Sequence, residues 1–216
     1  MRLRATALMA ALVSIAAGVA ACAPLAVTGI VAGAAVVADR RPAAAIVDDQ
    51  ALQVRATQRV KEVLPGTDLA YAYVTVFNGR MLLTGLAPDE RSREQAARVA
   101  AGIDKVRAVH NEIQVLQGTS LPSGLHDTTV TARVRASMLQ QKTLDIAAIR
   151  VTTQDRTVYL MGLVTEQEAA LAADAASRTG GVGRVVTLFD YISEQELAAL
   201  RGRPGSEPDG SASSMR

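Results

Sequence analysis

The residues most suited to chemistry in this chain of 216 residues are a single cysteine and two histidines, Cys22, His110 and His126. Neither histidine has a cysteine, a glutamate or a second histidine at the spacing of a metal-ligand set. One thiol can form neither an internal disulfide nor a thiolate cluster around a metal. The glycine-rich stretch 180–183 follows a predicted helix and precedes a strand, which is the reverse of a phosphate-binding loop. We therefore expect no catalytic residue, no metal and no cofactor.

Cys22 is suited to lipid attachment instead. It follows a basic start, an apolar run from Ala5 and the small residues Val-Ala-Ala, the pattern of a lipoprotein signal peptide. We expect cleavage before Cys22, diacylglycerol on its sulfur and acylation of its new amino group. Ala23 follows, whereas an aspartate there retains enterobacterial lipoproteins at the inner membrane, so the sequence favours the outer membrane. The alternatives are an ordinary secretory leader or a membrane span within the apolar residues 5–38.

A second stretch has the composition of a binding surface. A helix predicted over residues 128–142 carries Arg133, Arg135 and Lys142 and no acidic residue. At about 100° per residue, Arg135, Leu139 and Lys142 fall together, opposite the apolar side of that helix. Cations around an apolar residue suit an anionic bilayer surface.

The elements that must position this helix occur twice. The stretch 74–115 is repeated at 151–192, with Gly85 matching Gly162 at an offset of 77 residues. Further on, the sequence matches Gly102 to Gly181 and Ile113 to Ile192, at an offset of 79. Self-similarity over this length indicates a duplicated module.

Each copy predicts the order helix, hairpin, helix, strand. Asn78-Gly79 lies between alternating runs and predicts a two-residue turn that pairs Val76 with Met81. The same spacing pairs Thr153 with Val158 in the second copy. Apolar residues recur every four positions in the preceding helices, and the aspartates at the expected helix starts suggest N-caps. These residues are Leu52, Ala56, Val60, Val130, Val134 and Met138 on the apolar sides, Asp49 and Asp127 at the starts.

The pattern predicts an α+β fold of two modules, each a three-stranded mixed sheet covered on one face by two helices. Glycines are expected at structural turns, namely Gly79, Gly85, Gly102, Gly162 and Gly181. In order, the chain divides into a signal peptide (1–21), a lipidated apolar tether (22–47), module one (48–116), a linker (117–125), module two (126–193) and a helix end with a disordered tail (194–216).

The stretches VTTQDRTVYLMGLVTEQEA (151–169) and ASRTGGVGRV (176–185) resemble the BON family, whose mark is a strand, a glycine, a helix and a closing Gly-Val strand. Two copies behind a lipoprotein signal are similar to the outer-membrane members of that family. The resemblance implies a periplasm-facing protein that supports envelope integrity and is linked to division sites. It also implies binding of anionic phospholipid through the first helix of module two. Such proteins can carry an aromatic residue where this chain has Thr129, which indicates a shallower or more electrostatic contact.

Other functions remain open at this point. The formal charge of +2 falls near zero once the leader arginines are removed, which argues against nucleic-acid binding. The basic helix face could be merely solvated, with its charges answered by Asp145 or Asp155. A protein-interaction adaptor for an outer-membrane assembly partner could use Tyr73, Leu82 and Tyr159 on the uncovered sheet faces. A peptidoglycan-binding or osmotic-stress module is a further alternative.

Overall fold

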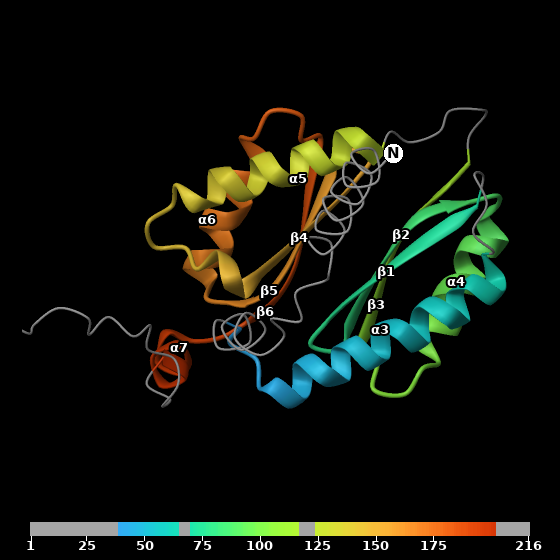
Figure 1. The fold of residues 1–216 in the computed structure, drawn as a ribbon, viewed down its shortest axis with the longest axis horizontal. Coiled ribbons are helices and arrows are strands. Elements are labelled where there is room, and N and C mark those ends of the chain that lie inside the picture. The colour runs from blue at the N-terminus through green and yellow to red at the C-terminus, as the bar shows by residue number, and fades with distance from the viewer. Residues whose placement is uncertain (1–38, 65–69, 117–123, 202–216) are drawn as a thin grey trace, which may run out of the picture. The chain divides into compact units, whose positions relative to one another are not determined.

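The computed structural model describes residues 39–64, 70–116 and 124–201 (Figure 1). The signal peptide, Cys22, most of the tether and linker, and the tail after Arg201 lie outside these residues. Within the described ranges, no helix is long and apolar enough to cross a membrane. Residues Val37–Arg216 form one compact unit, which contains both modules.

The first module is a mixed sheet with two helices on one face (Figure 1). Strand β1 is antiparallel to β2, and β2 is parallel to β3. Its elements are α3 (Ala43–Val63), β1 (Tyr71–Phe77), β2 (Arg80–Ala87), α4 (Glu90–Ala101) and β3 (Ala108–Val115).

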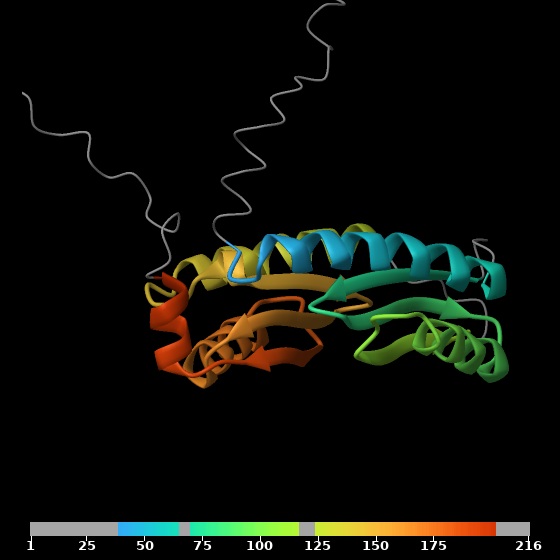
Figure 2. The same cartoon turned by 90° about the horizontal axis from the view of Figure 1, so that it is seen from below.

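The second module repeats this order and adds a C-terminal helix, as the view in Figure 2 also shows. Strand β4 is antiparallel to β5, and β5 is parallel to β6. Its elements are α5 (Gly124–Leu139), the short helix η2 (Ile146–Ala148), β4 (Ile149–Gln154), β5 (Thr157–Val164), α6 (Glu166–Ser177), β6 (Arg184–Tyr191) and α7 (Glu194–Arg201). The predicted α+β class and mixed three-stranded sheets are confirmed.

The hairpin registers agree with the alternation in the sequence. Val76 lies opposite Met81, and Thr153 lies opposite Val158. The helix stripes are buried as expected, and each packs with one face of its own sheet to form a separate core. Because strand residues alternate between faces, the other face of each sheet is left apolar and needs cover of its own.

Those remaining faces pack on each other. Leu82, Tyr159 and Met161 are each at most 1% exposed and form a third core together with Phe77 and Leu188. The expectation of open sheet faces is therefore wrong for Leu82 and Tyr159, because the duplicate supplies the cover. Tyr73 is the exception, with 61% of its surface exposed.

Two aspartates expected to cap helices act elsewhere. Helix α3 begins at Ala43, within the predicted tether, and α5 begins at Gly124, so Asp49 and Asp127 lie inside helices. Their carboxylates accept hydrogen bonds from the backbone amides of the hairpin turns. Asp49 binds the amides of Asn78 and Gly79, and Asp127 those of Asp155 and Arg156. Each helix is thus fixed to the turn of its own hairpin.

Gly85 and Gly162 are equivalent but lie inside strands β2 and β5, so the prediction of turns is wrong for both. A Cβ on Gly85 would lie 2.1 Å from the Tyr71 carbonyl oxygen, at a φ of +137°. A Cβ on Gly162 would lie 2.6 Å from the carbonyl oxygen of Ala148. The glycines are required by the close approach of the neighbouring backbone, from β1 at Gly85 and from the end of η2, just before β4, at Gly162. Gly79 does occupy a turn, with a φ of +73°.

The third strands align differently from the sequence match. Ile113 pairs with Gly85 and Phe189 pairs with Gly162, so Phe189 and not Ile192 is the counterpart of Ile113.

The helix ends show the same shift. Gly102 caps α4 at a φ of −80°, and its counterpart on α6 is Arg178 at −82°. Any residue adopts that conformation, so glycine is not needed there. Gly181, at a φ of +100°, corresponds to Lys105 at +70°.

Candidate lipid-contact surface and inter-module groove

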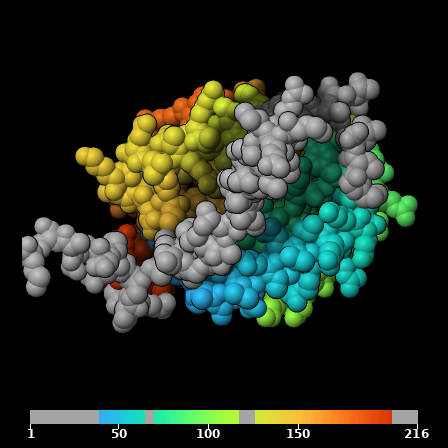
Figure 3. Space-filling model, viewed as in Figure 1, coloured from blue at the N-terminus to red at the C-terminus, as the bar shows by residue number. Residues whose placement is uncertain are grey.

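Helix α5 presents a basic outer side because its inner side is held in the core. Val130, Val134 and Met138 are fully buried, whereas Arg133 and Arg135 are exposed. Figure 3 shows α5, in yellow, at the molecular surface. Thr129 is also exposed on this helix.

Leu139 ends α5 with 71% of its surface exposed, more than any other large apolar residue in the described chain. Lys142 is exposed but lies after the helix, so the prediction that it shares a helical face with Leu139 is wrong. The chain turns at this point because Leu144 must enter the core, and the Leu144 amide bonds the Gln141 carbonyl.

The acidic residues that could have paired with these cations bind other residues. Asp145 accepts a hydrogen bond from Arg40, and Asp155 accepts one from Gln114. Among the residues that the structure describes, none forms a hydrogen bond or ion pair with the side chain of Arg133, Arg135 or Lys142.

The start of the described chain is bound to both modules through consecutive arginines, here called the arginine clip (Arg40–Arg41). Arg40 donates two hydrogen bonds of 2.6 Å to the carboxylate of Glu168 in module two. Arg41 donates to Asp49 in module one, and its guanidinium lies 3.9 Å from the Phe77 ring centroid. The clip therefore joins the modules near the point where the tether ends.

Glu168 has a second role as the N3 residue of the capping box that begins α6 with Thr165. Burial alone would raise the pKa of Glu168, but the hydrogen bonds from Arg40 and from the Thr165 amide more than offset this and lower it. The side chains of Arg40 and Glu168 are each 6% exposed, so this is a buried ion pair with its hydrogen bonds satisfied.

Two further ion pairs flank the inter-module core. Arg80 donates to Asp190 at 2.7 Å, and Arg184 donates to Glu112 at 2.7 Å. Burial in this core raises the pKa of Tyr159 to about 12.

The two histidines lie in different elements, β3 and α5. His110 lies in β3 with its Nε2 buried and unpaired among the described residues. Burial lowers the pKa of His110, and the nearby Arg80 lowers it further. His126 is exposed in the first turn of α5. No group of three or more potential metal ligands occurs in the described part of the chain.

A groove of about 380 Å³ lies between the arginine clip and module two. Arg135 from α5 and Arg150 from β4 line it, and Arg41 lies at the clip side. Sequence reasoning identified Arg135 but missed Arg150. Arg150 lies in the groove because of how the modules pack, and no local pattern in the sequence predicts that packing.

The paired modules define a class of protein. The family model described as the BON domain matches residues 48–117 and 126–193, well over half of the sequence. The chain belongs to the BON domain family.

Among individual proteins, the chain is similar to the outer membrane lipoprotein DolP of Haemophilus influenzae. The two are 28% identical over 170 residues, which cover 77% of this chain and 88% of that protein. A 21 kDa hemolysin of Actinobacillus pleuropneumoniae is 27% identical over 154 residues, covering 71% of this chain and 79% of the relative. The similarity to DolP places the chain at the outer membrane, as a lipid-anchored protein of the envelope.

A solved structure of CdsD, a structural protein of the type III secretion system of Chlamydia trachomatis, is 11% identical to the chain. The similarity covers 70% of this chain and 98% of that one, with a TM-score of 0.28. A score this low carries no argument about fold or function.

Proposed function

We propose that this envelope lipoprotein is not an enzyme and that it contacts anionic phospholipid through module two, supporting envelope integrity from the periplasmic side. The observation that carries the proposal is the exposure of Leu139 at the end of α5, with cations nearby that have no acidic partner among the described residues. Exposed leucine beside arginine and lysine suits the boundary between headgroups and acyl chains.

The binding free energies of the anchor and of α5 decide what each contributes to membrane binding. Each cation near an anionic surface contributes about 1 kcal/mol, so Arg133, Arg135 and Lys142 together contribute roughly 3 kcal/mol. Alone, that corresponds to binding weaker than millimolar. Lipid chains on one residue contribute about 0.8 kcal/mol per buried CH₂, and two or more chains hold a protein stably. The anchor therefore supplies residence, and α5 supplies orientation and lipid preference.

The anchor is assigned to Cys22. Intact mass of the purified protein should show a chain that begins at Cys22 and carries acyl groups. Cys22→Ser should accumulate as uncleaved precursor. A mature chain that begins elsewhere and keeps a free thiol would contradict the assignment.

Flotation with liposomes tests the contact of α5. Residues 23–216, produced without the leader and the anchor cysteine, retain the whole compact unit. At a lipid concentration of about 10 mM, which such weak binding requires, part of this protein should float with vesicles containing phosphatidylglycerol and none with pure phosphatidylcholine vesicles. Binding should weaken as salt is raised, because exposed charges are screened.

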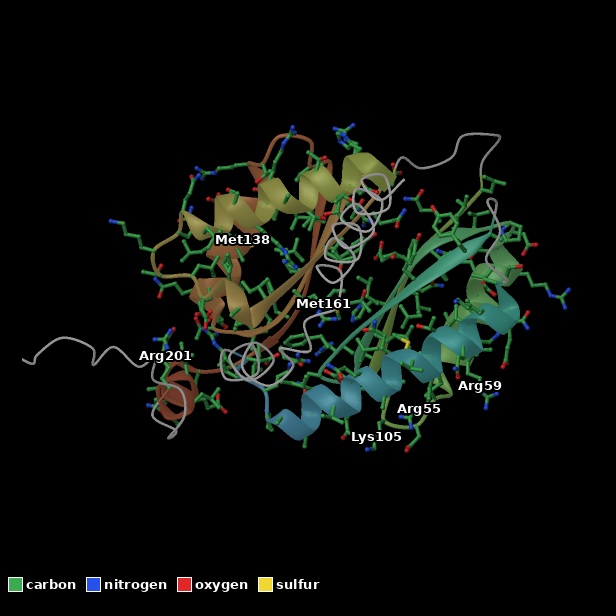
Figure 4. All side chains as sticks on the ribbon, in the orientation of Figure 1. Arg55, Arg59, Lys105, Met138, Met161 and Arg201 are labelled. Carbon is green, nitrogen blue, oxygen red and sulfur yellow. The ribbon has the colours of Figure 1, made fainter. Side chains whose placement is uncertain are left out.

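The decisive variant is Arg135→Glu with Lys142→Glu, which reverses two charges and should abolish flotation. Its matched control is Arg55→Glu with Arg59→Glu, two exposed cations on α3 that point away from the first sheet in Figure 4. The control should float as the wild type does. If the Arg135→Glu, Lys142→Glu variant floats as well as the control variant, the lipid contact is refuted and an adaptor function is favoured. Of the three docking residues proposed for an adaptor, only Tyr73 is exposed.

A further inference from the structure

The inter-module groove contains two cations that form no ion pair with any described residue. Arg135 reaches it from α5 and Arg150 from β4, at the edge of the second sheet. Both residues are exposed, and neither forms a hydrogen bond or ion pair with any residue in the described ranges. Guanidinium groups brought together in this way repel each other unless an anion lies between them.

The third arginine of the groove differs from the other two. Arg41 is 7% exposed and its guanidinium is occupied by Asp39 and Asp49. These two carboxylates are also the acidic groups that act on Arg150, and both are already bound to Arg41. Although Arg150 as a whole is exposed, partial burial of its charged end lowers its pKa, Arg41 and Arg135 lower it further, and Asp49 and Asp39 oppose the shift. Two cations and two carboxylates therefore act on Arg150 from a distance, and none of them forms an ion pair with it.

The remaining walls of the groove are apolar except for Asp39, whose carboxylate is paired with Arg41. Phe77, Ile146 and Ile149 line it beside the arginines. A volume of about 380 Å³ is at the small end of ligand sites and suits a headgroup, not a whole lipid. The guanidinium fork matches the oxygens of a phosphate group and can bind two of them at once.

We propose that this groove is a phosphate-binding site in which Arg135 and Arg150 hold the phosphate of a lipid headgroup or of a soluble phosphate ester. As a lipid site, the proposal rests on the function proposed above and extends it. In this arrangement the phosphate lies in the groove beside Arg135. The acyl chains begin near Leu139, one turn further along α5. Arg133, on the same helix, does not line the groove.

The test compares three single variants of residues 23–216, namely Arg135→Gln, Arg150→Gln and, as the control, Arg55→Gln, an exposed cation on α3 outside the groove. Binding to phosphatidylglycerol vesicles and to sn-glycerol 3-phosphate is measured separately, by flotation and by calorimetry. The two groove variants should each bind on the order of tenfold more weakly, as expected for loss of a charge-assisted contact. The control should keep most of its binding. Circular dichroism should show unchanged folding, since all three residues are exposed.

The outcomes separate the two proposals. If Arg150→Gln binds vesicles as tightly as the wild type while the double charge reversal does not, the groove site is overturned and the lipid function stands. If the wild type binds glycerol phosphate through Arg150 but does not bind vesicles, the groove stands, its ligand is a soluble phosphate and the lipid function fails. Binding of neither probe overturns both.

Discussion

Asp127 shows how a single residue fixes a helix to the hairpin turn of its module. Asp127 lies in α5 and is 5% exposed, yet its carboxylate is satisfied by the amides of Asp155 and Arg156 at 2.8 and 3.0 Å. Both turn residues have positive φ, at +46° and +59°, in a turn without glycine. Non-glycine residues adopt this conformation only at a cost. The carboxylate offsets that cost by binding the amides that the turn directs at the helix.

Replacing Asp127 by alanine should therefore lower the free energy of unfolding by about 3 kcal/mol, because hydrogen bonds to a charged acceptor are lost and the turn amides are left without a partner. Urea denaturation at neutral pH measures the change. Asp174→Ala removes an exposed pair with Arg178 and should stay within about 0.5 kcal/mol. A loss at Asp127 no larger than at Asp174 would show that the turn does not need the clamp.

At the scale of elements, the arginine clip makes the start of α6 sensitive to acid. The pKa of Glu168 is lowered in the folded state, so the unfolded chain takes up this proton first as the pH falls. The stability that Glu168 contributes is fully present above its ordinary pKa of 4.5 and is lost as the pH falls through the folded value.

The variant Glu168→Gln should be less stable at pH 7, by about 3 kcal/mol, because Arg40 is left buried without its counter-charge. The difference from the wild type should shrink as the pH falls below about 4.5, since the wild type then loses the same charge. Unfolding in urea across pH 3–7 measures how the free energy of unfolding of the wild type and of the variant changes with pH. Parallel slopes would mean that the ion pair contributes nothing to the acid sensitivity.

The sequence predicts elements well where the signal is local. The Asn78-Gly79 turn rests on two adjacent residues and occurs as expected, and the capping box of Thr165 and Glu168 likewise rests on residues only three apart. Strand alternation also sets which residues face the helices, so the separate cores follow from the pattern.

What fails to follow from the sequence depends on distant partners. Arg40 and Glu168 are 128 residues apart, and no periodicity links them. Arg150 looks like an ordinary exposed strand residue until the clip is placed beside it. Lys142 shares a helical face with Arg135 only if α5 continues past Leu139, and the core contact of Leu144 ends it there.

At the scale of the whole molecule, the inter-module core should make the two modules unfold together. Leu82 is 1% exposed in that core, which also contains Tyr159 and Met161 from module two. The flanking pairs Arg80–Asp190 and Arg184–Glu112 cross between the same modules.

Calorimetry of the wild type should show one unfolding transition. Leu82→Glu would bury a charge without a counter-ion and should split the transition in two, with module two unfolding separately. Tyr73→Glu is the control, because this residue lies on the same sheet face but is exposed, and it should change stability by less than about 1 kcal/mol. A single transition in Leu82→Glu, merely shifted, would mean that the contact does not couple the modules.

The arginine clip has a mechanical consequence. Arg40 grips module two and Arg41 grips module one, at adjacent positions of the chain. A pull that arrives through the polypeptide before Asp39 is thus divided between the modules in parallel, and is not passed from the first to the second in series. A force on the two modules loads both ion pairs together. The modules should therefore move as one body, even under a tension that would separate a module held by a single contact.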